Sequence, residues 1–128
     1  MKFLIVDDSR LSRNWSIQTL PEALRKRATI FEAEDGEAAV ALYKEHRPDI
    51  VLLDITMPKK NGFEALEEIR AFDPKAIVIM ISADRQKLTK ERVLALGATE
   101  ILYKPIETDK LRAVLLDLAT GKIHDDHV

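Results

Sequence analysis

Short, continuous runs of apolar residues recur along the chain, and longer amphipathic segments separate them. Four runs are rich in β-branched or large apolar side chains: Phe3–Val6, Ile50–Leu53, Ile77–Ile81 and Ile101–Tyr103. Runs of this kind are typical of strands that are buried on both faces of a sheet. A fifth run, Thr29–Ala33, is less hydrophobic and alternates, which predicts a strand nearer the edge of the sheet.

The segments between these runs have helical periodicity. The last of them places Leu111, Val114, Leu115 and Leu118 at positions i, i+3, i+4 and i+7 of one helix face. Shorter apolar stripes predict three more helices, at Ala38, Leu42 and Tyr43, at Phe63, Leu66 and Ile69, and at Val93 and Leu96. Thr108 is the predicted N-cap of the last helix, and Gly121 is its predicted end.

The first helical segment is the least regular. Leu11 and Trp15 share one face, whereas Ile17 and Leu20 lie nearer the opposite face. Pro21 predicts that this helix kinks or restarts. We interpret Trp15 as a packing residue, with a partly exposed ring near the site as the alternative.

Five strand-then-helix units in succession predict an α/β fold of the (βα)5 type. Such units form a doubly wound parallel sheet with helices on both faces, joined by right-handed crossovers. With 128 residues, the chain suits one domain, predicted to span residues 1–121 and to be followed by a short tail at 122–128.

Composition excludes several classes of protein. The 20 basic and 22 acidic residues leave a net charge of −2, which argues against nucleic acid or an anionic membrane as the main partner. No cysteine is present, so disulfides and thiolate chemistry are excluded. No run approaches the roughly 18 apolar residues that cross a bilayer. We therefore expect a cytoplasmic protein.

Charged and polar side chains follow the predicted strands at the ends where parallel sheets bind ligands. Asp7 and Asp8 follow the first strand, Asp54 the third, Ser82 the fourth and Lys104 the fifth. Two carboxylates about 4 Å apart repel by roughly 4 kcal/mol at an effective dielectric constant near 20. The cluster therefore needs compensation by protonation, by the Lys104 ammonium group or by a divalent cation.

The chemistry of this cluster favours phosphoryl transfer. Oxygen ligands without histidine or cysteine suit Mg²⁺, with Mn²⁺ or Ca²⁺ as alternatives. An aspartate carboxylate such as Asp54 can act as a nucleophile toward phosphorus. The transferred group needs its oxygens neutralised, which a cation, the Lys104 ammonium and the Ser82 hydroxyl together provide.

Five short motifs resemble those of the receiver domains of two-component response regulators, including single-domain chemotaxis regulators. They are Asp7-Asp8, Asp54-Ile-Thr-Met-Pro58, Asn61-Gly62, Ser82-Ala83 and Lys104-Pro105. The resemblance extends from Leu4 to about Leu118. It implies a flavodoxin-like sheet with strand order 2-1-3-4-5.

The resemblance also implies roles for the residues at the first and third strand ends. Asp54 is the implied phosphoacceptor, and Mg²⁺ is the implied cofactor. Its ligands are the carboxylates of Asp8 and Asp54 and the carbonyl of Thr56, with Asp7 acting through water.

Further roles follow from the same resemblance. Ser82 is the implied switch hydroxyl, and Lys104 pairs with the carboxylate or the phosphoryl group. The Lys104-Pro105 peptide resembles one that is often cis in the family. Thr56 and Asp84 occupy positions that tune the lifetime of the phosphoryl group.

One position departs from the family pattern. The family usually has a tyrosine or phenylalanine three residues before the strand-five lysine, and this chain has Ile101. Tyr103 lies on the same strand face and is a candidate substitute. Leu94 and Leu116 are predicted to join Ile101 and Tyr103 in an exposed apolar patch that binds a downstream partner or a second copy of the chain.

The sequence supports a phosphorylation-dependent signalling receiver, with a histidine kinase or a phosphotransfer protein as donor. The start at Met1 and the short tail favour a stand-alone protein, with a receiver portion of a hybrid kinase or multi-domain regulator as the alternative. We expect no enzymatic activity beyond its own phosphoryl transfer and dephosphorylation. An Asp-nucleophile phosphohydrolase is less consistent, because such enzymes usually carry an acid at the position of Thr56.

Overall fold

A computed structural model describes residues 1–57 and 59–120. Five parallel strands form a single sheet with the order β2-β1-β3-β4-β5. The strands are β1 (Lys2–Val6), β2 (Thr29–Ala33), β3 (Ile50–Asp54), β4 (Val78–Ser82) and β5 (Glu100–Tyr103). The predicted strand order is confirmed, and the weakest predicted strand, β2, is an edge strand.

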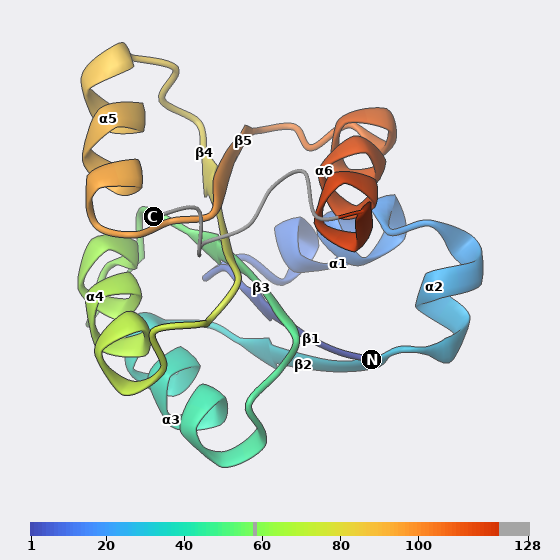
Figure 1. Cartoon of the computed structure of the whole chain (residues 1–128), viewed down its shortest axis with the longest axis horizontal. Helices are drawn as coiled ribbons and strands as arrows, with labels where there is room; N and C mark the ends of the chain where they lie inside the picture. The colour runs from blue at the N-terminus through green and yellow to red at the C-terminus, as the bar shows by residue number, and fades with distance from the viewer. Residues whose placement is uncertain (58, 121–128) are drawn as a thin grey trace.

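Helices cover both faces of this sheet (Figure 1). They are α1 (Arg10–Thr19), α2 (Glu22–Arg27), α3 (Gly36–His46), α4 (Gly62–Phe72), α5 (Lys87–Ala95) and α6 (Thr108–Thr120). Helices α3, α4 and α5 lie on one side, and α1 and α6 lie on the other (Figure 1). Within the described residues, no helix is both long enough and apolar enough to cross a membrane.

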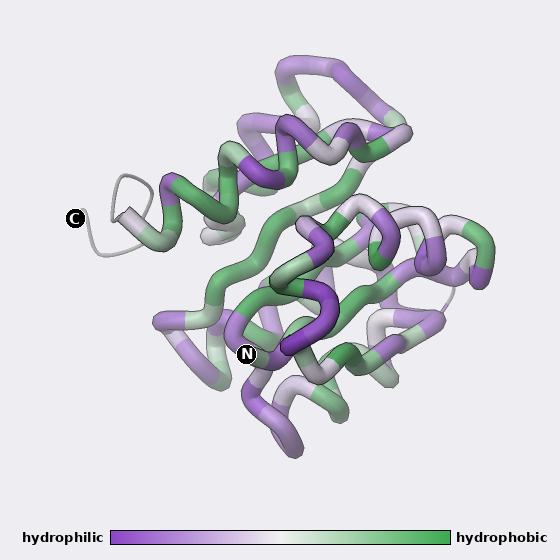
Figure 2. The backbone as a smooth tube through the Cα atoms, turned by 90° about the vertical axis from the view of Figure 1, so that its right-hand side faces the viewer, coloured by the Kyte–Doolittle hydropathy of each residue, from purple (hydrophilic) through white to green (hydrophobic). Residues whose placement is uncertain are grey.

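Alternation along the strands divides the core into two layers. Leu4, Val51 and Met80 face α3, α4 and α5, where they pack with residues such as Leu66 and Val93. Their strand neighbours face the other way, and Phe3, Leu52 and Ile79 pack with Leu20 and Leu111. The strands are accordingly the most hydrophobic part of the molecule, and polar residues concentrate on the outer helices (Figure 2).

The strands extend slightly beyond the apolar runs that predict them. Asp54 is the last residue of β3 and pairs with Ile81, and Ser82 is the last residue of β4 and pairs with Tyr103. A polar residue can end a strand in this way because backbone pairing does not depend on the side chain.

Helix boundaries also differ from the predicted ones. Thr108 is the first residue of α6 rather than its N-cap, and the carbonyl of Glu107 accepts the first hydrogen bond, from Leu111. Pro21 separates α1 from α2, so the predicted restart is confirmed. Gly121 and the predicted tail at 122–128 lie outside the described residues, as does Pro58.

Gly62 holds the loop after β3 against the end of that strand. Asn61 caps α4 by accepting a hydrogen bond from the Glu64 amide, and the Glu64 carboxylate accepts one from the Asn61 amide. The amide of Gly62 donates to the carbonyl of Ile55 at 2.7 Å. A Cβ atom at Gly62 would overlap the carbonyl oxygen of Asp54. Only glycine allows this close approach, so α4 begins directly against the end of β3.

Candidate functional site

Three carboxylates converge at the carboxyl edge of the sheet. One oxygen from each of Asp7, Asp8 and Asp54 lies within 4.8 Å of the others. Asp7 and Asp54 are buried, whereas Asp8 is exposed. The sequence predicted this convergence from the parallel sheet, because the ends of β1 and β3, which are neighbours, meet at one edge.

Lys104 reaches this cluster from the end of β5. Its Nζ atom donates to Asp7 Oδ2 at 2.9 Å and to Asp54 Oδ2 at 3.3 Å. Burial alone would lower the pKa of Lys104, but the hydrogen bond to Asp7 and the charge of Asp54 raise it. Lys104 therefore stays charged while it is shared between two acids. Its peptide bond to Pro105 is cis, as the resemblance implied.

Asp54 has the most strongly perturbed ionisation in the cluster. Burial, followed by the negative charge of Asp7, raises the pKa of Asp54 from 3.8 to about 6. Lys104 opposes this rise without cancelling it. The Asp54 carboxylate is thus ionised at neutral pH, but its negative charge is only partly compensated.

Asp7 and Asp8 differ in how well their charges are satisfied. Burial alone would raise the pKa of Asp7, but hydrogen bonds with Ser12, Lys104 and the Ser9 amide lower it. Asp8 has no hydrogen-bond or ion-pair partner for its carboxylate within residues 1–57 and 59–120. Lys104 thus contacts two of the three acids and leaves Asp8 unpaired among the described residues. This donor set of oxygens fits a hard divalent cation such as Mg²⁺.

Ser82 and Asp84 form a small hydrogen-bonded turn at the end of β4. The Ser82 hydroxyl donates to the Asp84 carbonyl and accepts from the Asp84 amide, both at 2.9 Å. The Asp84 carboxylate accepts from the Thr89 hydroxyl at 2.6 Å and from the Gln86 amide at 2.8 Å. The bond from Thr89, then that from Gln86, lowers the pKa of Asp84. The loop before α5 is therefore tied both to the strand end and to the first turn of α5.

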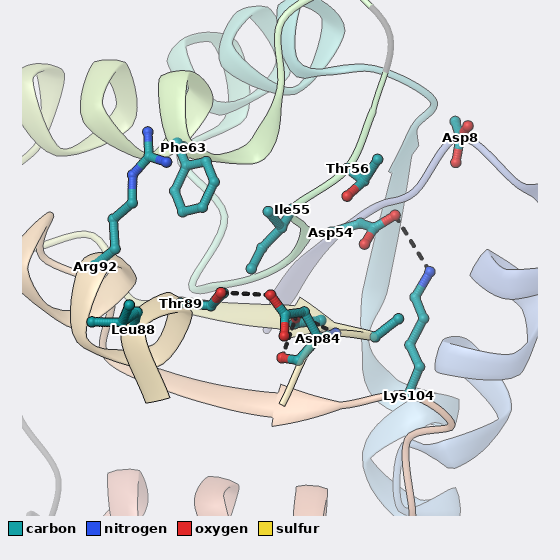
Figure 3. A pocket seen from close by; sticks show the side chains of 12 residues that line it. Asp8, Asp54, Ile55, Thr56, Phe63, Asp84, Leu88, Thr89, Arg92 and Lys104 are labelled. Atoms are coloured by element: carbon teal, nitrogen blue, oxygen red, sulfur yellow. Dashed lines mark hydrogen bonds and ion pairs between the residues drawn. The ribbon is translucent and has the colours of Figure 1, made fainter. Parts of the chain in front are cut away.

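These strand ends line a cavity of about 640 Å³. Asp8, Asp54, Thr56, Ser82 and Lys104 line it together with Asp84, as expected for residues of one site. Figure 3 shows Lys104 pointing toward Asp54, while Asp84 turns toward Thr89.

The opposite wall of the cavity was not predicted from the sequence. It consists mainly of Phe63 on α4 and of Leu88, Thr89 and Arg92 on α5. The Arg92 guanidinium lies 3.7 Å from the centroid of the Phe63 ring (Figure 3). Leu88 is 75% exposed although it is apolar. Its position outside the inward stripe of α5 was the one feature of the sequence that indicated an apolar side chain on this wall.

A second, mainly apolar groove of about 370 Å³ lies beside the first and shares Lys104 with it. Leu11 and Trp15 of α1 form one side, and Pro105 and Ile106 form the other. The Trp15 indole donates to the Ile106 carbonyl at 2.9 Å, yet 55% of the residue is exposed. Trp15 is therefore a partly exposed ring beside the site and no part of the core, because the core contacts of α1 come from its opposite face.

The predicted apolar patch around β5 is only partly exposed. Leu94 and Leu116 are 40% and 60% exposed. Ile101 is buried at 5%, so its predicted contribution to an exposed surface is wrong. The pleat turns Ile101 toward the core under α3, α4 and α5. Tyr103 follows on the same face and is half-buried, with the Arg85 guanidinium 4.8 Å from its ring centroid.

Comparison with known proteins identifies the family. Residues 3–116 match the family model of the response regulator receiver domain. The chain belongs to this family. The flavodoxin-like strand order and the motifs at the strand ends agree with this assignment.

Individual relatives and solved structures are similar to most of the chain. Protein CcdB of Bacillus subtilis is 46% identical over 110 residues, which are 86% of this chain and 90% of CcdB. The chemotaxis protein CheY of the same organism is 38% identical over 112 residues, again 86% of this chain and 90% of CheY. A crystal structure of a CheX–CheY–BeF3–Mg²⁺ complex from Borrelia burgdorferi has a TM-score of 0.84 and 37% identity, and the match covers 93% of this chain and 89% of that one.

Proposed function

We propose that this receiver domain is a phosphorylation-dependent signalling switch whose phosphoacceptor is Asp54. One observation carries the proposal: a buried carboxylate, with a pKa raised to about 6, lies beside a charged lysine at the mouth of a cavity. Such a carboxylate is partly stripped of water and retains a nucleophilic oxygen at neutral pH. A buried acid without such a role would be costly to retain.

The acidic cluster fits Mg²⁺ held by the Asp8 and Asp54 carboxylates and the Thr56 carbonyl, with Asp7 acting through water. Asp8 suits a direct ligand because its carboxylate is exposed and has no partner among the described residues. Asp7 suits an indirect role because its oxygens already accept from Ser9 and Lys104. When bound, the cation neutralises charge on the phosphoryl oxygens.

The reaction proposed for this chain is attack by an Asp54 carboxylate oxygen on the phosphorus of a phosphohistidine. A P–O bond forms to Asp54 as the P–N bond to the imidazole breaks, and the leaving imidazole keeps the electron pair and takes a proton. Lys104 compensates the negative charge that arrives beside Asp54. The donor is a histidine kinase or a phosphotransfer protein.

Ser82 and Asp84 suit the steps after transfer. The Ser82 hydroxyl can donate to a phosphoryl oxygen only by giving up its bond to the Asp84 carbonyl. Phosphorylation would then loosen the turn that ties β4 to α5, which gives the switch a physical basis. Thr56 and Asp84 both line the cavity, so both are placed to alter the access of water to the phosphoryl group.

The groove beside the site suits the donor protein. Its apolar wall, formed by Leu11, Trp15 and Ile106, shares Lys104 with the phosphoryl cavity. A donor that seats an apolar side chain in this groove would bring a neighbouring histidine toward Asp54. Exposed apolar surface of this kind marks an interaction site.

The output surface is proposed to be the α5–β5–α6 region. Leu94 and Leu116 offer exposed apolar side chains there, and the half-buried Tyr103, at the end of β5, lies beneath the Arg85 guanidinium. A downstream target or a second copy of the chain is the proposed partner. The relatives CcdB and CheY, each matched over 90% of its length, support a stand-alone receiver as the proposed form.

The test is incubation with Mg²⁺ and a small acyl phosphate, followed by the mass of the intact protein. We expect one phosphoryl adduct that is labile at alkaline pH and absent from Asp54→Asn. Asp49→Asn, at the amino end of β3, is the matched control and should be phosphorylated normally. An adduct on Asp54→Asn would refute the proposal.

A further inference from the structure

Arg13 on α1 makes an unusual pair of contacts behind the acidic cluster. Its Nε atom lies 3.0 Å from Glu32 Oε1 on the edge strand β2, and its Nη1 atom donates to the carbonyl oxygen of Asp7 at 2.8 Å. Only 12% of the Arg13 side chain is exposed. One guanidinium group therefore links α1, the end of β1 and β2.

The contact with Asp7 completes a full set of hydrogen bonds around that residue. The Asp7 amide donates to the Ala33 carbonyl at 3.1 Å. Its two carboxylate oxygens accept from the Ser9 amide and from Lys104, both at 2.9 Å. Its carbonyl accepts from Arg13. Every polar group of Asp7 is thus fixed by the surrounding protein.

Asp8 is in the opposite situation, because its exposed carboxylate has no partner within the described part of the chain. The peptide group that joins Asp7 to Asp8 contains the carbonyl that Arg13 holds. A peptide group is planar, so fixing its carbonyl also fixes the direction in which the chain leaves toward Asp8. The peptide before Asp8, and not a described contact of its own carboxylate, is therefore the part of its surroundings that the Arg13 contact constrains.

We propose that Arg13 is a positioning residue that orients Asp8 for the divalent cation by clamping the Asp7–Asp8 peptide. The inference rests on the proposed function, since it assumes that Asp8 is a metal ligand. Arg13 itself touches neither the cation nor the phosphoryl group. Glu32 sets the guanidinium plane from the other side, so the planar, forked geometry of arginine is needed.

The clamp and the charge of Arg13 predict opposite effects on metal affinity. A positive charge near the site repels a cation, so neutralising Arg13 would tighten Mg²⁺ binding if charge alone mattered. Loss of the clamp would weaken binding, because a misdirected Asp8 is a poorer ligand. Groups that orient metal ligands typically contribute 10–100-fold to affinity. The repulsion is smaller, because the Arg13 charge is already paired with Glu32, so the clamp outweighs it.

The test is calorimetric titration of the whole chain with MgCl₂ for wild type, Arg13→Gln and Arg10→Gln. Arg10 lies three residues earlier on α1 and is exposed, so Arg10→Gln removes the same charge without touching the clamp. We expect Arg13→Gln to weaken Mg²⁺ binding by about tenfold. Arg10→Gln should bind as tightly as wild type or slightly more tightly. Arg13→Lys, which keeps the charge and has a single donor nitrogen in place of the guanidinium fork, should recover part of the loss.

The three variants distinguish the clamp from an effect of charge and from misfolding. Wild-type affinity in Arg13→Gln, or tighter binding, would overturn the proposal. Equal weakening in Arg10→Gln would overturn it too, because the effect would then not depend on the contact with Asp7. Urea unfolding shows whether Arg13→Gln is folded under the conditions of the titration. If Arg13→Gln is unfolded, the comparison uses Arg13→Lys in its place. Wild-type affinity for Mg²⁺ in folded Arg13→Lys would then overturn the proposal. Failure of wild type to bind Mg²⁺ would instead refute the proposed function.

Discussion

Lys104 Nζ lies 3.3 Å from Asp54 Oδ2, but the shorter of its two contacts, 2.9 Å, is with Asp7. The lysine is therefore shared between the two acids. The pKa of Asp7, which has the shorter contact, is lowered, whereas the pKa of Asp54 is raised to about 6. The protein holds Asp54 in a state where its ionisation costs free energy. A bound cation or a covalently attached phosphoryl group with its own partners relieves that cost.

This cost makes the stability of Asp54→Asn, relative to wild type, depend on pH. The pKa of Asp54 is 3.8 in the unfolded chain and about 6 in the folded one, so the folded state favours the protonated acid. The stabilisation from the protonated acid is fully present below pH 3.8 and is lost as the pH rises through about 6. Asp54→Asn avoids this loss.

In metal-free buffer we expect Asp54→Asn to be more stable than wild type at pH 7.5, by about 2–3 kcal/mol, since one pKa unit corresponds to about 1.4 kcal/mol. The difference should shrink toward zero near pH 4. Urea unfolding of both proteins across this range measures it, with EDTA present throughout. A difference that is constant with pH would show that the Asp54 pKa is not raised.

Gly62→Ala should damage the site through the backbone. The added Cβ atom would overlap the Asp54 carbonyl oxygen and lie 2.6 Å from the Ile55 Cα atom. We expect a loss of about 1–3 kcal/mol in the free energy of unfolding, as for overpacked interiors, together with weaker Mg²⁺ binding. Gly97→Ala is the control, because Gly97 has a positive φ of 101° at the opposite edge of the sheet. It should lose stability but bind Mg²⁺ normally, and a similar loss of binding in both variants would show that the contact between Gly62 and β3 is not the cause.

Leu11→Glu should separate the protein donor from small-molecule donors. Leu11 is 81% exposed on the wall of the apolar groove, so a charge there repels an apolar docking side chain without disturbing the core. We expect transfer from a phosphorylated histidine protein to slow by at least tenfold, while the rate with a small acyl phosphate is unchanged. Loss of phosphate from the donor protein measures the first rate, and intact mass measures the second. Slowing of both rates to the same extent would place Leu11 in the chemistry instead of in docking.

Leu116→Glu should act on output alone. Leu116 is 60% exposed on α6, away from the acidic cluster, and a glutamate there would disrupt an apolar interface. We expect it to abolish dimerisation or target binding of the phosphorylated protein and to leave the phosphorylation rate unaltered. Sedimentation velocity of the phosphorylated protein, with and without its target, measures association. Association as tight as that of wild type would exclude this surface as the output interface.

Much of the fold followed from the apolar runs, because strands buried on both faces leave a continuous pattern that few alternatives explain. The cluster at the carboxyl edge could also be predicted from the sequence. Its members follow the ends of the apolar runs: the pair Asp7-Asp8, then Asp54, Ser82 and Lys104. The position of β2 at the edge was visible in its weaker, alternating pattern. These features depend on local sequence and on parallel topology alone.

Features set by side-chain packing were harder to foresee. Ile101 was expected at the surface, yet the pleat of β5 turns it into the core. Trp15 was interpreted mainly as a packing residue, yet its indole donates to the Ile106 carbonyl, 91 residues away, and its ring lines a groove. The Arg13 contact with Asp7 joins a helix face to a strand end, and no periodicity encodes such a contact. Each of these depends on how two elements pack, which the pattern of a single sequence does not specify.

The central claim is that Asp54 accepts phosphorus with the help of a divalent cation. Its most direct test is peptide mapping after treatment with a small acyl phosphate, in the presence of Mg²⁺ or of EDTA, with borohydride reduction to mark the acyl phosphate. We predict that Asp54 is the modified residue and that modification needs Mg²⁺. Modification of another residue, or equal modification of Asp54 in EDTA, would contradict the claim.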